Sequence, residues 1–583
     1  MHLFKVWAPL AKKVAVKLGE QTHPMKGPER NGNWKLALET ASAGTEYFFV
    51  LDDDPTCLPD PRSMYQPKGV HGPSQVYDHK AFVWSDRTWQ GPPLTGAILY
   101  ELHIGTFTSE GNFDGAIGKL PYLVDLGITH IEIMPVAEAA GDRGWGYDGV
   151  DLFATSSCYG GPDAFKRFVN ASHAQGIGVL LDVVYNHFGP VGNYTGKFGP
   201  YVTSKHKTPW GDAVNLEDSG SDEVRGFFSD NALMWMRDFH VDGLRLDAIH
   251  EMVDRSAVHF LEQLSANVDR LSATIGRRLV LIAESDLNNP MIVTSIEAKG
   301  WGIDAQWSDD FHHALFTLLH VEEGGKGYYD DFGEFECLAK SLKEMFVYDG
   351  KYSQYRKRHH GRPVDGLSAH RFVGFIQNHD QVGNRATGDR LEHIIGTERT
   401  KIALGLVLTA PFLPMLFQGE EYAASTPFLY FADHKDPEMA KLVSEGRKKE
   451  FAAFGWDANQ IPNPEDLSTF TASCLNWSEV HEGTHGEMLE WTKKLIQLRR
   501  HSSSLNDGDR GHLQVTFSEE DKWLRMNRGE LCIFTNLGKE AQHFPVGEEY
   551  RLELASLPKE TSLVDRVVTV PANGFVIVSA EED

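Results

Sequence analysis

The sequence predicts an α/β fold: a (β/α)8 (TIM) barrel flanked by an N-terminal and a C-terminal β domain. The chain has 583 residues, which suggests more than one domain. Eight short apolar runs in the middle of the chain alternate for the most part with helical segments, as parallel barrel strands do. Both ends instead carry short strands separated by turn signals, which is typical of small β domains.

The domain at the start of the chain is predicted to be an immunoglobulin-like β-sandwich over residues 1–92. Apolar runs at residues 13–18 and 46–51 are divided by turn residues such as Asn31-Gly32. Residues 90–93 (Gln-Gly-Pro-Pro) form the expected linker to the next domain. We expect the barrel domain to occupy residues 95–500.

The expected barrel strands are eight apolar runs of four to eight residues. They lie at residues 97–102, 128–134, 177–184, 241–246, 279–283, 302–306, 372–376 and 414–417. Predicted helices are 116–126, 162–175, 224–239 and 258–275. The loop at residues 187–222 is long and rich in Gly, Pro and aromatic residues, as functional loops often are.

The last part of the chain returns to short strands, for example at residues 531–536 and 566–570. We therefore expect a C-terminal β-sandwich over residues 505–583. A polar insert around residues 351–366 is predicted to lie on the surface.

Composition narrows the class of partner. The formal net charge is −26, which disfavours nucleic acids and anionic membranes because both are polyanions. The chain has no run of about 20 apolar residues, and its first residues lack the pattern of a signal peptide. Its five cysteines are widely spaced and suggest neither a disulfide framework nor a zinc site. We expect a cytoplasmic protein with no nucleic-acid or membrane partner.

Four segments at predicted strand ends carry acids, histidines or an arginine. They are residues 182–187 (DVVYNH), 243–250 (GLRLDAIH), 281–284 (LIAE) and 377–380 (QNHD). The carboxyl ends of all strands in such a barrel face one mouth, where these folds keep their chemistry. Asp247, Glu284 and Asp380 are therefore expected to meet in one pocket. Converging carboxylates are what the cleavage of a glycosidic bond requires.

The surroundings of each acid indicate its role in glycoside cleavage. A retaining reaction needs a nucleophilic carboxylate and a carboxylic acid about 5 Å apart. Arg245 precedes Asp247 by two residues on the same strand face and can keep it ionised, so Asp247 is the expected nucleophile. Glu284 follows an apolar run and is the expected acid/base. Asp380 is the expected stabiliser of the transition state, and Asp182 the expected buried partner of Arg245.

Further polar residues near the strand ends can donate hydrogen bonds to sugar hydroxyls: His187, His250 and His379. An isolated strand-end Asp or His is more often a helix cap or an ordinary polar contact. A metal site is the main alternative, since Asn186, Asp182 and Glu284 are possible Ca²⁺ ligands. No compact ligand spacing supports such a site, so we expect no metal and no cofactor.

Aromatic residues in loops are candidate platforms for sugar rings. Tyr147 follows Trp145-Gly146 and is the expected floor of the cleavage subsite. Further candidates are Trp210, Trp301 and Trp307. Most aromatic side chains in proteins are core residues, and that is the alternative for each of them.

Taken together, the four segments closely resemble those of the α-amylase family of glycoside hydrolases and transglycosylases (glycoside hydrolase family 13). The resemblance covers about residues 95–490. It implies a retaining double displacement with Asp247 as nucleophile, Glu284 as acid/base and Asp380 as stabiliser. The residues that match the usual sugar contacts of the family are Arg245, His187 and His379. The N-terminal domain looks like the module of isoamylases and branching enzymes.

Within this family, residues 375–385 (FIQNHDQVGNR), together with segments 100–107, 243–250 and 418–422, are similar to the maltooligosyltrehalose trehalohydrolases. That resemblance implies hydrolysis of the α-1,4-glucosidic bond next to the terminal trehalose unit of maltooligosyltrehalose, which releases trehalose and a maltooligosaccharide. It adds Gln381 and Arg385 to the substrate contacts and implies a pathway shared with a maltooligosyltrehalose synthase. His250 stands where amylases often carry Lys followed by His, which leaves the contacts to the leaving sugar open.

Two alternatives to this assignment remain. One is a branching or debranching enzyme that acts on related α-glucan oligosaccharides. The other is a non-catalytic, amylase-like binding protein, a class that typically lacks at least one of the three acids. This sequence retains all three.

Overall fold

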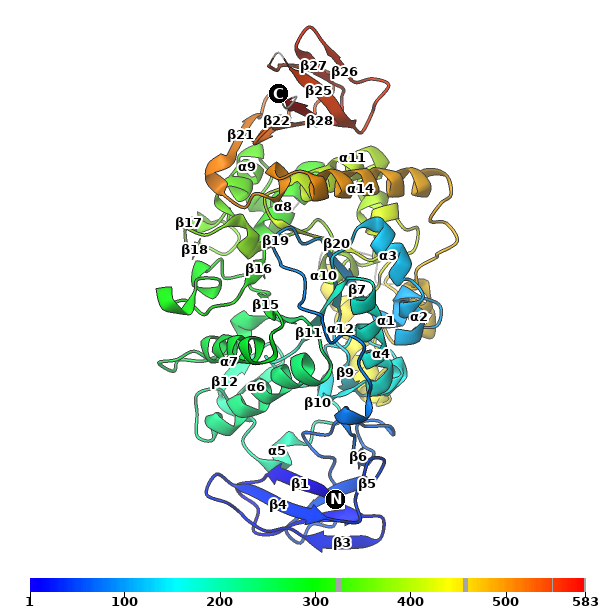
Figure 1. Ribbon diagram of the computed structural model, residues 1–583, viewed down its shortest axis with the longest axis vertical. Coiled ribbons are helices and arrows are strands. Elements are labelled where there is room, and N and C mark those ends of the chain that lie inside the picture. Colours follow the sequence, from blue (N-terminus) through cyan, green and yellow to red (C-terminus); the bar gives the residue numbers. More distant parts are fainter. Residues whose placement is uncertain (321–327, 454–459, 548, 581–583) are drawn as a thin grey trace.

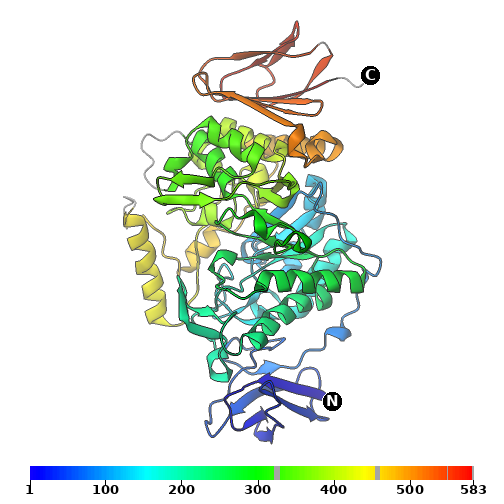
Figure 2. The same ribbon diagram turned by 90° about the vertical axis from the view of Figure 1, so that its left-hand side faces the viewer.

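Three parts of the protein follow one another along its long axis. The computed structural model describes residues 1–320, 328–453, 460–547 and 549–580. The N-terminal strands lie at one end, the barrel in the middle and the C-terminal strands at the other end (Figure 1). The side view of Figure 2 shows the same order. The predicted fold class is confirmed, and the domain boundaries given above stay a prediction.

All eight predicted barrel strands are present and form one closed parallel barrel. Neighbours in the chain are neighbours in the barrel, and β20 closes it by pairing with β7, with Phe417 opposite Glu101. The strands are β7 (Leu99–Leu102), β8 (His130–Ile133), β11 (Gly178–Val183), β14 (Gly243–Leu246), β15 (Val280–Ala283), β16 (Ala305–Trp307), β19 (Phe372–Gly374) and β20 (Leu413–Phe417).

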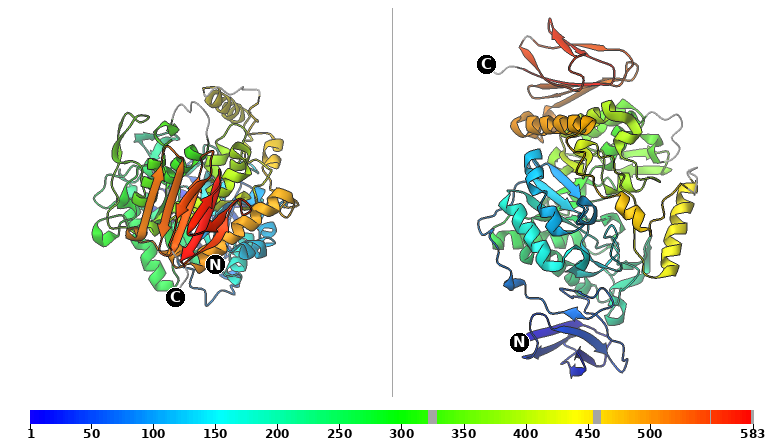
Figure 3. Two further views of the ribbon diagram at one scale, coloured as in Figure 1. Left: turned by 90° about the horizontal axis from the view of Figure 1, so that it is seen from above. Right: turned by 90° about the vertical axis from the view of Figure 1, so that its right-hand side faces the viewer.

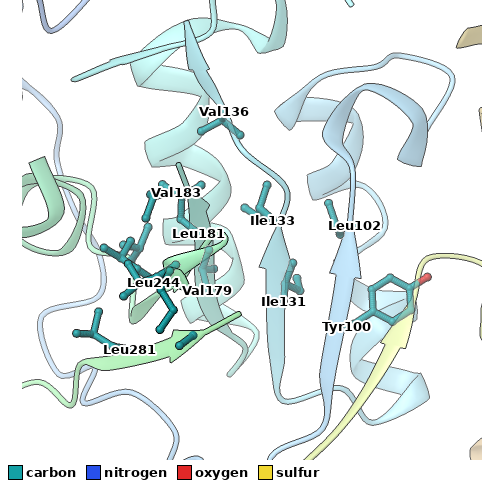
Figure 4. Packing of buried hydrophobic residues seen from close by; sticks show 14 of the residues in the cluster. Tyr100, Leu102, Ile131, Ile133, Val136, Val179, Leu181, Val183, Leu244 and Leu281 are labelled. Carbon is teal, nitrogen blue, oxygen red and sulfur yellow. The ribbon is translucent and has the colours of Figure 1, made fainter. Parts of the chain in front are cut away.

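Side chains of each barrel strand alternate between the helix layer and the barrel interior. Val179, Leu181 and Val183 of β11 pack outward in the cluster that Figure 4 shows, whereas Leu180 belongs to a separate apolar cluster inside the barrel. This follows from the two-residue period of a strand. Asp182 shares the inward face with Leu180, so polar residues at the strand ends are directed into the mouth.

Helices surround the barrel. The predicted helix 116–126 is divided into α2 and α3, and the other three predicted helices are confirmed within a few residues at each end. The main surrounding helices are α2 (Phe113–Ile117), α3 (Leu120–Leu126), α4 (Gly161–Ala174), α6 (Ser221–Asp238), α7 (Phe260–Ile275), α8 (Asp309–Leu319), α9 (Phe335–Glu344), α11 (Leu391–Thr409) and α14 (Gly483–His501). Smaller or peripheral helices are α1 (Ile104–Phe107), α5 (Thr195–Phe198), α10 (His379–Gly383), α12 (Pro437–Ala453) and α13 (Leu467–Ala472).

No helix in the described part of the chain combines the length and the apolar character that crossing a membrane would need.

Figures 2 and 3 show α12, in yellow, at the periphery of the barrel.

The N-terminal strands form two antiparallel sheets, one of two strands and one of four. Phe4 and Val6 of one sheet and Val16 and Phe49 of the other are buried in the same apolar cluster. The strands are β1 (His2–Trp7), β2 (Val14–Leu18), β3 (Gln21–Pro24), β4 (Asn33–Leu38), β5 (Glu46–Leu51) and β6 (Ser74–Gln75). An ion pair between Arg62 and Asp230 of α6, at 2.8 Å, helps to join this region to the barrel.

The C-terminal strands form a five-stranded and a three-stranded antiparallel sheet. Phe534 and Val576 of the larger sheet and Phe544 and Val568 of the smaller one share an apolar core. Seen from above, these strands lie over the barrel (Figure 3). They are β21 (Leu513–Ser518), β22 (Trp523–Arg528), β23 (Leu531–Asn536), β24 (Gln542–Pro545), β25 (Tyr550–Ala555), β26 (Ser562–Val564), β27 (Val567–Val570) and β28 (Gly574–Ala580).

Two segments predicted as loops contain hairpins. The long segment after β11 contains β12 (Val202–Thr208) and β13 (Gly211–Val214), joined by a tight turn at Pro209-Trp210. The polar insert contains most of the hairpin of β17 (Asp349–Ser353) and β18 (Arg358–Gly361). β12 and β18 are rich in Lys, His or Arg, and β13 and β17 are short and partly polar, so apolar alternation does not reveal the hairpins. A further short pair is β9 (Ala137–Ala139) and β10 (Gly149–Thr155).

Candidate active site

The three acids expected from the sequence lie at the same mouth of the barrel. Asp247 directly follows β14, Glu284 directly follows β15, and Asp380 lies in the first turn of α10, beyond β19. Their side chains are 11%, 18% and 37% exposed, so all three remain accessible from the mouth. The barrel therefore brings together acids that are far apart in the sequence.

Arg245 connects the acids beneath the mouth. Its fully buried guanidinium lies 2.7 Å from Asp182, 2.9 Å from Asp247 and 2.9 Å from Glu284. The predicted pairing with Asp182 is confirmed, whereas the contact with Glu284 was not expected. The ring of Trp307 lies 4.2 Å from the guanidinium carbon and completes its surroundings through a cation–π contact.

Asp247 is held by donors on both sides. Asn186 Nδ2 donates to Asp247 Oδ2 at 2.7 Å and to its main-chain oxygen at 2.8 Å. Donors of this kind, with Arg245, stabilise the ionised carboxylate. The next residue, Ala248, has the left-handed φ of 40°, a conformation that costs about 1 kcal/mol for alanine. This turn directs the Ala248 N–H to Glu284 Oε2, at 2.7 Å.

His379 links the first and the seventh strand of the barrel at the mouth. Glu101 of β7 accepts hydrogen bonds from its Nδ1 at 2.5 Å and from its main-chain N–H at 2.9 Å. Its Nε2 lies 2.8 Å from the Tyr147 hydroxyl and 3.6 Å from Asp380. Burial opposes a charged ring, but the Asp380 and Glu101 carboxylates prevail and raise the pKa of His379 to about 9. The ring is therefore a cation at neutral pH.

This raised pKa predicts a dependence of stability on pH. The ordinary pKa of histidine is 6.5, so the stabilisation is complete below pH 6.5 and is lost as the pH rises through about 9. A shift of this size is worth about 3 kcal/mol. Glu101→Gln should lower the pKa of His379 and reduce the part of the unfolding free energy that is lost over this range. Urea unfolding at pH 6.5 and 9.5 measures the difference, and an equal pH dependence in both proteins would contradict it.

Other carboxyl groups of the mouth and interior are shifted toward the protonated form. Burial raises the pKa of Asp380, and the charge of Glu284 adds to this effect. Burial raises the pKa of Asp182 to about 7, although the charge of Arg245 works in the opposite direction. Inside the barrel, burial raises the pKa of Glu132 well above its ordinary value. Burial thus favours the neutral form of Glu132, and this limits the negative charge beneath the site.

The candidate sugar contacts Tyr147 and His187 lie beside the acids. The Tyr147 hydroxyl donates to Asp182 Oδ2 at 2.6 Å. His187 Nδ1 bonds the side chain of Asn186, and its Nε2 lies 3.1 Å from the main-chain oxygen of Tyr147. Trp210, from the turn of the β12–β13 hairpin, stacks on the His187 ring at 4.5 Å and is half exposed. An aromatic side chain therefore reaches the mouth from the long loop.

Gln381 and Arg385 are the two candidate sugar contacts that follow Asp380 in the chain. They line a cavity of about 300 Å³ whose wall also includes Asp380. The Tyr329 hydroxyl donates to Gln381 at 3.4 Å. His250 is half-buried, and its Nδ1 has no hydrogen-bond partner among the described residues. The roles of these residues in sugar binding stay predictions.

Two of the tryptophan candidates have other partners. Trp307 is 2% exposed beneath Arg245, so its prediction as a sugar platform is wrong. Trp301 is half-buried and stacks on the ring of His259, with the ring centroids 4.1 Å apart. Both were suggested by residue type alone, which does not reveal where a ring faces.

Some site residues were missed in the sequence. Glu101 and Glu132 lie inside apolar strands. The signal that could have identified them is their position in the strand, because side chains alternate and these two acids fall where a side chain faces the barrel interior. Asp309 lies two residues after β16, at a strand end like the predicted acids. It was missed because β16 is short and its apolar pattern is weak. Across the described ranges, no group of three or more His, Cys, Asp or Glu side chains is arranged to hold a metal ion.

Comparison with known proteins defines the class to which this barrel belongs. The family model described as the alpha amylase catalytic domain matches residues 75–208, which include β7, β8 and β11. A solved structure titled as a putative alpha amylase from Salmonella typhimurium has 36% sequence identity and a TM-score of 0.89. It covers 99% of this chain and 97% of its own. The barrel is therefore of the α-amylase class.

Curated relatives narrow the class further. A malto-oligosyltrehalose trehalohydrolase from Rhizobium sp. (strain M-11) is 47% identical over 91% of this chain and 90% of its own length. A 1,4-alpha-glucan branching enzyme from Bacillus cereus is 31% identical over 72% of this chain and 66% of its own. The chain belongs to the family of malto-oligosyltrehalose trehalohydrolases.

Proposed function

We propose that the protein is a retaining glycoside hydrolase that cleaves the α-1,4-glucosidic bond next to the terminal trehalose unit of maltooligosyltrehalose. The products are trehalose and a maltooligosaccharide. The observation that carries this proposal is the placement of Asp247 and Glu284 on one guanidinium, each 2.9 Å from Arg245, at an open barrel mouth. The family of the chain supports the choice of substrate.

In the first half of the proposed reaction, Asp247 attacks the anomeric carbon of the sugar on the non-leaving side. The bond from that carbon to the bridging oxygen breaks, and Glu284 gives its proton to the oxygen. Glu284 then becomes a carboxylate, which Arg245 and the Ala248 N–H stabilise. Asn186 holds the Asp247 carboxylate in position for attack.

In the second half, Glu284 takes a proton from a water molecule, which attacks the same carbon and releases Asp247. Two inversions leave the configuration retained. Both transition states carry positive charge on the sugar ring, and Asp380 opposes that charge and binds hydroxyl groups. Protonated His379 and His187 are the proposed donors to the same sugar, and the ring of Tyr147, whose hydroxyl donates to Asp182, is its proposed floor.

The substrate has an unusual end, because its last two glucose units are joined through both anomeric carbons. We infer that another enzyme, a maltooligosyltrehalose synthase, must first form that linkage at the end of a maltooligosaccharide. The net charge of −26 supports a neutral sugar partner rather than a nucleic acid or an anionic membrane. Both enzymes would then work in the cytoplasm.

The substrate proposal predicts a preference that a direct comparison measures. With maltooligosyltrehalose and a maltooligosaccharide of equal length, kcat/KM should favour the first by at least about tenfold, or about 1.4 kcal/mol in transition-state binding. Free trehalose should be the product. Comparable cleavage of both substrates, or no free trehalose, would contradict the proposal.

The branching-enzyme relative gives the alternative of transfer to another glucan chain. Incubation with amylose, followed by digestion with a debranching enzyme, detects any new branch points. New branches without trehalose release would favour the branching function.

A further inference from the structure

Two adjacent aspartates begin helix α8, and they have different surroundings. Asp310 is 3% exposed. It accepts hydrogen bonds from the main-chain N–H groups of Val347 at 2.6 Å and Tyr348 at 2.9 Å, and from Asn288 Nδ2 at 2.8 Å. All three bonds go to Oδ2, and through them Asp310 joins α8 to the segment before β17, which is a structural role.

Asp309 has no such partners. It is half-buried, and none of the described residues donates a hydrogen bond to its carboxyl group. Burial raises its pKa well above the ordinary value for an aspartate, and the charge of Glu284 adds to this effect. Both influences favour the protonated carboxyl group, which carries an O–H donor for which the described residues supply no acceptor. A partly buried donor without an acceptor is costly, and a bound ligand can supply one.

The barrel order places Asp309 within the active site. β16 lies between β15, which leads to Glu284, and β19, which leads to Asp380. Asp309 follows the end of β16 by two residues, so it stands on the rim between these two acids. The negative charge of Asp380 also raises the pKa of Asp309.

The same order indicates which part of the substrate Asp309 faces. Along the rim, Asp247 of β14 comes first, Glu284 of β15 second and Asp309 third. Glu284 protonates the oxygen of the leaving sugar in the function proposed above, and Asp309 lies on the far side of Glu284 from Asp247. We propose that the Asp309 carboxyl donates a hydrogen bond to a hydroxyl of the leaving sugar and so contributes to the choice of leaving group.

This inference rests on the proposed function, in which the leaving sugar is trehalose. A different role for Asp309 is an interaction of its negative charge with the N-terminal end of α8, which would stabilise the helix without touching substrate. The two roles differ in what the side chain must supply, because the proposed role needs a donor and the helix role needs a charge.

The test compares Asp309→Ala and Asp309→Asn on two substrates. The first substrate is maltooligosyltrehalose, and the second is a 4-nitrophenyl α-maltooligoside, whose leaving group has no sugar hydroxyl. Asp309→Ala should lower kcat/KM on the first by about 10- to 100-fold, the range for a lost hydrogen bond in a substrate site, and on the second by less than about threefold. Asp309→Asn keeps a donor of similar size and should stay within about fivefold of the wild type on both.

Inhibition by the product gives a second readout. Trehalose should inhibit cleavage of the aryl substrate by the wild type, and its inhibition constant should rise about tenfold or more in Asp309→Ala. Asp310→Asn is the matched control: it should lower the melting temperature and impair both substrates to the same extent.

Three results would overturn the inference: equal losses on both substrates in Asp309→Ala, an Asn variant as impaired as the Ala variant, or unchanged trehalose inhibition. If Asp309→Ala does not fold, the retained activity of Asp309→Asn still tests the need for a donor rather than a charge. If the wild type instead prefers plain maltooligosaccharides, the substrate proposal fails, and the comparison is repeated with a maltooligosaccharide in place of maltooligosyltrehalose. Asp309 is then tested independently of trehalose.

Discussion

Asp247→Asn and Glu284→Gln should each lower kcat by about four orders of magnitude while leaving the protein folded. The amide that replaces the nucleophile cannot form the covalent intermediate, and the amide that replaces the acid/base cannot supply a proton to the bridging oxygen. Both replacements keep the shape of the side chain, so the contacts with Arg245 are altered in charge but not in size. Initial rates on maltooligosyltrehalose and circular dichroism measure activity and folding.

An aryl substrate separates the two roles. A nitrophenolate leaves without a proton, so Glu284→Gln should still form the covalent intermediate and release a burst of nitrophenol, whereas Asp247→Asn should show no burst. Asp53→Asn, at a side chain that is 90% exposed, is the control and should retain full activity. Substantial steady-state activity in either active-site variant, or a burst from Asp247→Asn, would show that the roles are assigned wrongly.

Arg245→Met should destabilise the fold by about 3–5 kcal/mol, because it removes the positive partner of three carboxylates in a buried setting. Methionine fills much of the volume of the arginine stem, so the expected loss arises from unpaired charge rather than from a cavity. Turnover should also be lost, since Asp247 and Glu284 no longer share a fixed partner. Urea unfolding and initial rates measure the two effects.

A second substitution tests whether charge is the cause. Adding Asp182→Asn to Arg245→Met removes a buried carboxylate that has lost its ion pair, so the double variant should be more stable than Arg245→Met alone. In the presence of Arg245, Asp182→Asn should instead be destabilising. Additive losses in the double variant would contradict the account of Arg245 as the charge that holds Asp182.

The sequence was sufficient for the barrel because its strands are continuous apolar runs that end in polar residues. Even β16, which has only three residues, was indicated by a short apolar run. The two hairpins were not predicted, since the strands of β12 and β18 carry Lys, His and Arg and have no buried face along most of their length. Their conformation depends on tertiary packing and turn geometry rather than on an apolar pattern.

For the site, the rule that strand ends face one mouth was sufficient to bring Asp247, Glu284 and Asp380 together. The rule does not show which partner a long side chain selects. The sequence predicts that Arg245 pairs with Asp247 and Asp182, and in the structure it also forms an ion pair with Glu284, which follows the next strand. Glu101 was overlooked because its partner, His379, is distant in the sequence and only barrel closure places the two side chains together.

Closure of the barrel also has a consequence for how the protein is made. β7 emerges early from the ribosome, but its partner β20 is among the last barrel strands to be synthesised. Until β20 has been synthesised, one edge of the apolar strand β7 has no partner strand, and Glu101 lacks its hydrogen-bond donor His379 for as long as the barrel is not closed. Contacts so distant along the chain form slowly and late in folding. A nascent or truncated chain that ends before β20 should therefore have no partial activity and should depend on chaperones, and sugar cleavage should begin only when the last strand is in place.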